Sequence, residues 1–484
     1  MSLQSVWQKH FTFGRKDVVA EPIAAQLSSD AGLILFRELD ERLGATEQFA
    51  AALVDAVLPD ADHSVLAMTR MRVFGILADY EDQNDHDALR SDPLFKLISV
   101  GSTQAPDLAS QPTLSRFENR VSPQDYLRLR GVFVDQFLDS FTTPPDRLTF
   151  DIDPYDDPAH GEQQLVFFDG PYDQYQYQVR LITCAENDMI VLFTLLYGSA
   201  AAALGIEDDL EYLIQRVRTR FPDVQIIIRA DTGFASPEVY ECCERLRTVY
   251  TIGMGMNPRL LRDSDDLLKQ ANGLYFLTQE PQRLFLSEKY AAGSWGCARD
   301  VVIKVEVTAE GVNRRAVVTN RPGVCLLPAA TYEEYANRGE SENRNKEMKL
   351  GLYGGRLSDH RYFANLFRVA LHTLAHNLLV QMRRLVADPP SERPANTVVA
   401  RNPELPVEAL PQPQRRHWFN HRRREDPLGE GQIQTWRTRV IKVAAEVTES
   451  ARRIVIRLSG SWPYLAHYEQ ISDCVLASAA RSTG

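Results

Sequence analysis

The chain has 484 residues, of which 44% are hydrophobic and 25% charged, a composition typical of a globular protein of about three domains. This composition excludes disordered and fibrous low-complexity classes. The formal net charge of −11 argues, taken as one number, against a polyanionic partner such as nucleic acid. The charge is uneven, however: residues 1–150 carry 14 basic and 22 acidic side chains (−8), whereas residues 385–484 carry 14 and 11 (+3).

Targeting and membrane signals are weak. The first residues, MSLQSVWQKH, contain no apolar stretch of the secretory type. Residues 190–206 are 17 uncharged residues, fewer than the roughly 20 that a membrane span requires. The six cysteines form no C-x-x-C pair. We therefore expect a cytoplasmic protein of bacterial type without a membrane partner.

Residues 1–140 are predicted to form a helical region, because apolar residues such as Leu35, Leu39 and Leu43 recur at helical spacing. Within it, Ser110 and Pro112 are typical of a helix start. The side chains that this helix would expose suit contacts with phosphates and base edges, although a polar surface helix explains the same pattern. They are Gln111, Thr113, Ser115 and Arg116.

From residue 147 onward, strand and helix patterns alternate, which predicts an α/β core over residues 141–384. Residues 224–230 are almost continuously apolar, as expected of a central strand that is covered on both faces. Residues 388–413 contain seven prolines, so we interpret 385–431 as a linker. Residues 432–484 are predicted to form a small C-terminal unit, with a helix at 435–447 and a strand at 452–458.

Acidic residues stand at the ends of two predicted strands. Asp151 and Asp153 share one face of the strand near residue 150, and Asp231 ends an apolar run just before Gly233. Carboxylates at strand ends of an α/β sheet meet in space, and oxygen ligands suit Mg²⁺ or Mn²⁺. Each acid alone is equally explained as a turn or helix cap.

A third acid lies in a predicted helix at 331–350. Tyr335, Arg338, Glu342 and Lys349 fall within one stripe of about 60°, roughly 21 Å long, on a continuous helix. A carboxylate flanked by an aromatic and two cations suits a phosphodiester at a metal site with further phosphates alongside. A salt-bridged surface helix is the alternative interpretation.

These four residues match the signature Y-(2)-R-(3)-E-(6)-K of a group of bacterial DDE transposases, and the chain resembles that group. Several segments, in order, resemble the insertion-sequence 1380 family: ASQPTLSRFEN, FDIDPYDDPAHGEQQLVFFDGPYDQYQY, IIIRADTGF, ENRNKEMKLGLYGGRLSDHRYFANLFRVAL and TWRTRVIKVAAEV. The resemblance covers most of the chain and is poorest over residues 385–430.

The resemblance implies an RNase H-like catalytic core with a β-rich insertion at about 255–330, preceded by a helical DNA-binding region and followed by a small C-terminal unit. It implies Asp153, Asp231 and Glu342 as catalytic residues that bind two Mg²⁺ (or Mn²⁺) ions, with Tyr335, Arg338 and Lys349 contacting DNA. The family commonly has Thr two positions after the first Asp, where this chain has Tyr155, so Asp151 stays an alternative to Asp153.

The implied activity is excision of an insertion sequence at its terminal inverted repeats and strand transfer into target DNA. The implied partners are double-stranded DNA and a second copy of the chain, in a homodimeric synaptic complex associated with the nucleoid. A nuclease on the same fold, or a domesticated DNA-binding protein that no longer cuts, are the alternative functions.

A basic and aromatic run lies in the linker. We predict that it contacts the DNA backbone and stacks a tryptophan, although a solvated charge run fits as well. Its residues are Arg415, Arg416, Trp418, Arg422, Arg423 and Arg424. Two other motifs carry no prediction of chemistry: His372 and His376 lack the glutamate of a zinc helix, and Gly253-Met-Gly255 breaks the dinucleotide fingerprint.

Overall fold

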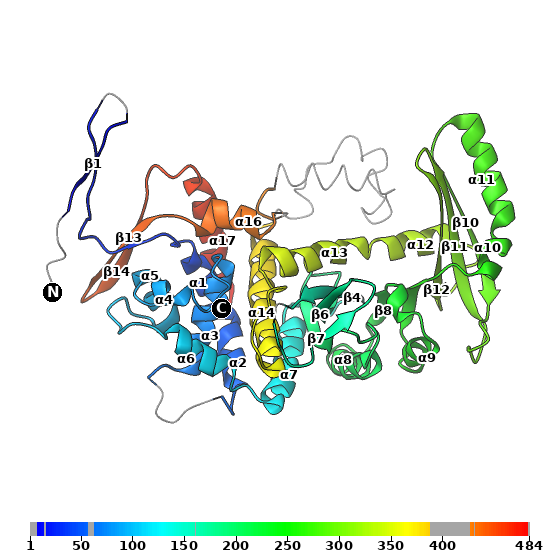
Figure 1. The fold of residues 1–484 in the computed structure, drawn as a ribbon, viewed down its shortest axis with the longest axis horizontal. Coiled ribbons are helices and arrows are strands. Elements are labelled where there is room, and N and C mark those ends of the chain that lie inside the picture. The colour runs from blue at the N-terminus through cyan, green and yellow to red at the C-terminus, as the bar shows by residue number, and fades with distance from the viewer. Residues whose placement is uncertain are drawn as a thin grey trace.

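The computed structural model of the chain describes residues 7–13, 16–56, 62–159, 161–387, 426–429 and 431–482. Along the horizontal axis of Figure 1, a helical part that contains both ends of the chain lies on one side of the long helix α14 (Tyr362–Val386), and a mixed α/β part lies on the other. None of the helices in the described ranges has both the length and the apolar character that crossing a membrane requires.

A nine-stranded mixed sheet forms the α/β part. Its strand order is β10-β11-β12-β9-β8-β4-β6-β5, with β7 paired to β6. Strands β4, β8 and β9 run parallel, whereas β6 and β7 run antiparallel to their neighbours. The bounds of the central strands are β4 Arg147–Pro158, β5 Phe167–Asp169, β6 Gln174–Cys184, β7 Ile190–Tyr197, β8 Gln225–Ala230 and β9 Val249–Met254.

Strand β8 is the apolar run expected near residues 224–230, and all of it except Gln225 is buried. Ile226 and Ile228 pack into one apolar cluster with Leu213 of helix α8 (Ile206–Arg220). The cluster also includes residues of α9 (Pro237–Arg245), which follows the short 3₁₀ turn η1 (Thr232–Phe234). This burial fixes the carboxyl end of β8 next to the middle of β4, where the candidate acids lie.

The segment expected to be β-rich, 255–330, begins with two helices, α10 (Pro258–Asp263) and α11 (Asp265–Thr278). The strands β10 (Gln282–Tyr290), β11 (Arg299–Thr308) and β12 (Gly311–Thr319) follow. Because Val317 of β12 pairs with Gly253 of β9, these strands continue the central sheet. Figure 1 shows them at the end of the molecule farthest from the N-terminus.

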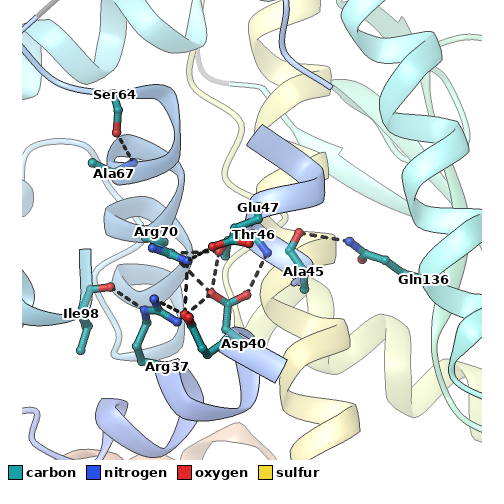
Figure 2. A network of polar contacts seen from close by, with 11 residues as sticks. Arg37, Asp40, Ala45, Thr46, Glu47, Ser64, Ala67, Arg70, Ile98 and Gln136 are labelled. Atoms are coloured by element: carbon teal, nitrogen blue, oxygen red, sulfur yellow. Dashed lines mark hydrogen bonds and ion pairs between the residues drawn. The ribbon is translucent and has the colours of Figure 1, made fainter. Parts of the chain in front are cut away.

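The N-terminal helices are joined by a buried polar network around Asp40 (Figure 2). Asp40 of α1 accepts hydrogen bonds from the backbone nitrogen (2.8 Å) and hydroxyl (2.6 Å) of Thr46, and Arg70 of α3 lies 3.5 Å away. Gln136 of α7 donates to the carbonyl of Ala45, which links α7 to α2 (3.1 Å). The helices are α1 Leu33–Leu43, α2 Ala45–Ala51, α3 Val65–Leu77, α4 His86–Leu89, α5 Pro93–Val100, α6 Gln111–Glu118 and α7 Pro123–Asp139.

The two ends of the chain pack together. Strand β3 (Leu27–Ser28) pairs with β13 (Ala445–Ser450), which also pairs with β14 (Arg453–Leu458). Gly32 permits this contact, because a Cβ there would lie 1.9 Å from the carbonyl oxygen of Val440. The remaining elements are β1 Lys9–Phe11, β2 Val18–Ala20, α16 Ile433–Trp436, the π-helical turn η4 Arg437–Ile441 and α17 Leu465–Ser482.

Candidate active site

Asp153 of β4 lies at the centre of the candidate site. Nη1 of Arg338 is 3.2 Å from its Oδ1, and Nδ2 of Asn345 donates a hydrogen bond of 2.9 Å to its Oδ2. Burial raises the pKa of Asp153 to about 7 against the opposing charge of Arg338, and the charges of Asp231 and Glu342 add to the rise. The three acids are thus close enough to repel one another, as like charges that share a site do.

Asp231 reaches this site because β8 runs parallel to β4. Ile152 and Ala230 are the last pair of that ladder, and Asp153 and Asp231 each follow directly. The Asp231 side chain accepts a hydrogen bond of 2.8 Å from the backbone nitrogen of Gly233 and caps the turn η1. The strand end therefore presents its acid from a fixed turn.

Glu342 comes from a helix that is interrupted twice. Helix α12 (Pro328–Ala336) ends before a turn at 337–338, α13 (Gly339–Lys346) follows, and residues Glu347–Gly351 form a π-helical turn, η2. The prediction of one continuous helical stripe is therefore wrong. Glu342 is half exposed, and its Oε1 lies 3.5 Å from Nη2 of Arg338, which contacts both Glu342 and Asp153.

Lys349 of the turn η2 contacts β4 at a different residue, Asp156. Its Nζ is 2.6 Å from Oδ1 of Asp156, and this hydrogen bond and charge lower the pKa of the Asp156 carboxyl although burial opposes them. The break in the helix and the π-helical turn explain why Lys349 does not line up with Arg338 on one face.

Tyr335 packs beside the acids. The guanidinium of Arg338 lies 5.9 Å from the centre of its ring. A Cβ on Gly253 would lie 2.6 Å from the Tyr335 hydroxyl and 3.0 Å from the backbone nitrogen of Thr232, so only glycine leaves room there. Burial raises the pKa of the Tyr335 hydroxyl, which keeps it protonated and able to donate.

Asp151 is engaged in a different contact. Its two oxygens accept hydrogen bonds of 2.6 and 2.7 Å from Arg229, which stands directly across the parallel ladder. Another nitrogen of Arg229 donates to the backbone carbonyl of Glu334 in α12 (2.8 Å). Asp151 is buried and its oxygens are occupied by this pair, whereas the oxygens of Asp153 contact Arg338 and Asn345.

The donor chemistry of Asp153, Asp231 and Glu342 fits a hard divalent cation, since all three offer carboxylate oxygens and repel one another. As the side chains stand, the described residues contain no group of three acidic, histidine or cysteine side chains arranged to hold a metal ion. Arg338 supplies the positive charge between Asp153 and Glu342. Divalent ions would therefore take over the neutralising role of Arg338.

The expected DNA-contacting residues of α6 lie on the other side of α14 from the sheet (Figure 1). Leu114 and Phe117 are buried, while Gln111, Thr113 and Ser115 are partly exposed and Arg116 is exposed. The basic and aromatic run Arg415, Arg416, Trp418, Arg422, Arg423 and Arg424 lies outside the described residues. His372 and His376 are buried in α14, as expected of core histidines.

Sequence reasoning missed three residues of this region. Asn345 follows Glu342 by three positions, so helical spacing alone places it on the same side as that acid. Arg229 and Asp156 could be assigned only once strand register and the path of the interrupted helix were known.

A family model described as transposase DDE domain group 1 matches residues 11–398. The chain belongs to this transposase family. No curated protein shows a significant match to the transposase. Among solved structures, it is similar to a piggyBac transposase synaptic complex with hairpin DNA, at 12% identity, with 73% of this chain and 75% of that chain covered and a TM-score of 0.41.

Proposed function

We propose that this transposase excises an insertion sequence at its terminal inverted repeats and joins it to target DNA, as a member of the insertion-sequence 1380 family with an RNase H-like core. The observation that carries the proposal is that Arg338 contacts both Asp153 and Glu342, beside the end of the β4–β8 ladder that precedes Asp231. The strand order β7-β6-β4-β8-β9, with its last three strands parallel, supports the proposed core.

In this proposal Asp153, Asp231 and Glu342 hold two Mg²⁺ or Mn²⁺ ions. Two such ions, when bound, activate a water or a 3′-hydroxyl and stabilise the leaving oxygen of an in-line displacement. Asn345 orients Asp153 by its hydrogen bond, and the turn at Gly233 orients Asp231. Three carboxylates carry −3 and two ions carry +4, so the site becomes attractive to a phosphodiester only when it is loaded.

Arg338 has two roles in succession. Without metal it pairs with Asp153 and Glu342; with metal bound, its planar guanidinium is released toward a backbone phosphate, which it can hold by two parallel hydrogen bonds. Tyr335 positions this guanidinium and the adjacent nucleotide. Its ring lies against Arg338, and its hydroxyl packs against Gly253. Lys349 holds a further phosphate beyond Asp156.

We further propose that residues 1–140 bind DNA, with Gln111, Thr113, Ser115 and Arg116 of α6 at the DNA, and that the run at 415–424 contacts its backbone. Residues 141–384 form the catalytic core, 385–431 the linker and 432–484 the C-terminal unit. Two copies act together on paired ends of double-stranded DNA. The exposure of Arg116 and the partial exposure of its neighbours support this role for α6.

The test is cleavage of a supercoiled plasmid that carries the two inverted repeats flanking the coding sequence, in Mg²⁺. We expect double-strand breaks at the repeats with wild type and none with Glu342→Gln. Glu340→Gln is the matched control, because Glu340 lies on the same helix, bonded to Asn343 rather than to the site. Retained cleavage by Glu342→Gln would remove Glu342 from the proposed triad, and uncut repeats with wild type would contradict excision.

A further inference from the structure

The hairpin of β5 and β6 exposes an unusual number of aromatic side chains. Phe167, Phe168, Tyr172 and Tyr175 are 46–59% exposed, although they lie within nine residues of one another. Single apolar residues scattered over a protein surface are normal, whereas several exposed on one short element point to a binding role. Neither the proposed catalytic chemistry nor the proposed DNA-binding helix uses this hairpin.

The four aromatics are arranged on both faces of the hairpin. Phe168 stands across the ladder from Tyr175, with ring centres 5.5 Å apart. Phe167 points to the opposite face, where its ring lies 5.8 Å from that of Tyr197 at the end of β7. Tyr172 occupies the turn between the strands.

The hairpin is joined to the strand that carries Asp153, because β6 pairs with β4 from Asp153 to Pro158. Partial burial raises the pKa of the Tyr172 hydroxyl, and the negative charges of Asp156 and Asp169 raise it further. The charges of Asp231 and Asp153 act in the same direction.

A hydrogen bond also ties the hairpin to the site. Gln174, the first residue of β6, donates a hydrogen bond of 3.1 Å to Asp156, the partner of Lys349. The hairpin is thus connected through Asp156 to the helix segment that carries Glu342.

We propose that the β5–β6 hairpin is a stacking platform for an unpaired base of the DNA strand whose phosphodiester lies at the carboxylates. Aromatic faces stack on any base, whatever the sequence. The neighbouring Asp156 and Asp169 disfavour a backbone phosphate at this place and tolerate an uncharged base. The platform rests on the proposed function, because only DNA at the carboxylates brings a base to it.

The direct test uses two single-stranded probes with the full chain, in Ca²⁺, which loads the carboxylates but lacks the strict octahedral preference of Mg²⁺, so that no cleavage is expected. One is fluorescein-labelled dT12; the other is a 12-mer of abasic tetrahydrofuran units, which keeps the phosphates and lacks the bases. Fluorescence anisotropy gives the affinity for each. We expect wild type to prefer dT12, and the double variant Phe168→Ala, Tyr175→Ala to bind dT12 about 10- to 100-fold more weakly with unchanged affinity for the abasic probe.

The matched control is Phe276→Ala, Leu277→Ala, which removes two apolar side chains that are 77% and 78% exposed on α11. It should leave both affinities unchanged. The variant Phe168→Leu, Tyr175→Leu keeps apolar bulk and removes the aromatic faces, so it should lose dT12 binding as the alanine variant does. If the alanine variant fails to fold, the leucine variant is the test.

Equal binding of both probes by wild type would overturn the platform, as would an equal loss in the α11 control or a retained dT12 preference in the leucine variant. These outcomes are separable from the proposed function. Plasmid cleavage without a preference for dT12 would contradict only the stacking platform. A preference for dT12 without any cleavage at the repeats would contradict only the proposed excision.

Discussion

Nη1 of Arg338 lies 3.2 Å from Oδ1 of Asp153, and this contact places a cation of the chain itself between the acids of the candidate site. The same guanidinium approaches Glu342 to 3.5 Å. Because these acids repel one another, Arg338 stabilises their proximity when no metal is bound. The proposed metal binding would therefore be coupled to the release of Arg338.

Divalent ions should stabilise the folded chain. A ligand that binds only the folded state raises stability by about 2.7 kcal/mol when its concentration is 100 times Kd. We expect Mg²⁺ or Mn²⁺ to raise Tm with increasing concentration in wild type and in Glu340→Gln, as measured by scanning fluorimetry. Glu342→Gln should respond only at much higher concentration. An equal response in Glu342→Gln would place the ions elsewhere.

Asp151 and Asp153, which both lie in β4, should respond differently to substitution. Asp151→Asn leaves Arg229 buried without its carboxylate, which costs about 3–5 kcal/mol and should lower Tm. Asp153→Asn should keep Tm and reduce cleavage about 1,000-fold, because several kcal/mol of transition-state stabilisation are lost with a metal ligand. Thermal scans and plasmid cleavage measure both. Normal cleavage by a folded Asp153→Asn would transfer the role to another acid.

Two glycines of β9 and its end provide a matched pair. Gly253→Ala should displace Tyr335 or the turn that follows Asp231, since its Cβ would lie 2.6 Å from the Tyr335 hydroxyl. We expect about a tenfold loss of cleavage, roughly 1.4 kcal/mol in the barrier. Gly255→Ala meets nothing within 4 Å and should cleave normally. Equal cleavage activity of the two variants would show that the close packing of Tyr335 against Gly253 is not needed for cleavage.

Asp157 should make stability depend on pH. Its side chain is fully buried, and desolvation raises its pKa from 3.8 to about 7, which exceeds the lowering by Arg368 and Lys349. The folded state thus holds a proton that the unfolded chain has lost between these values. Its stabilising contribution is complete below pH 3.8 and disappears as pH rises through 7.

Asp157→Asn removes this dependence. From pH 5 to pH 8 the Tm of wild type should fall relative to that of Asp157→Asn by on the order of 5 °C, from about 2–3 kcal/mol of linked free energy. Parallel Tm curves for the two proteins over this range would contradict the assignment.

Local patterns predicted that Asp153 and Asp231 lie next to each other, because a parallel ladder brings together the residues that follow its last pair, Ile152 and Ala230. They did not predict that β4 continues to Pro158, so Asp153 lies within a strand and not at its end. They could not predict the place of Lys349, since helical spacing assumes an unbroken helix and this one turns at 337–338 and becomes π-helical at Glu347. Helical patterns also extended the segment at 435–447 too far: the helix ends at Ile441 and β13 begins at Ala445.

Contacts between distant segments were beyond sequence reasoning. The pairing of Ser28 with Ala445 joins segments near the two ends of the chain. The sequence of neither segment indicates which segment it pairs with. The ion pair of Asp151 with Arg229 depends on strand register, which a run of apolar residues does not determine. The sequence leaves the choice between Asp151 and Asp153 open, and we propose Asp153 because Arg229 occupies both oxygens of Asp151.

Strand transfer is the measurement that tests the central claim most directly. Pre-cut duplexes that end in the inverted repeat with a free 3′-hydroxyl are incubated with the full chain, a target plasmid and Mg²⁺, and joined products are sequenced. The account predicts repeat ends covalently joined to the plasmid by wild type and by Glu340→Gln, and none by Glu342→Gln. Cleavage of repeats without any joined product would contradict it and would identify a metal-dependent nuclease instead.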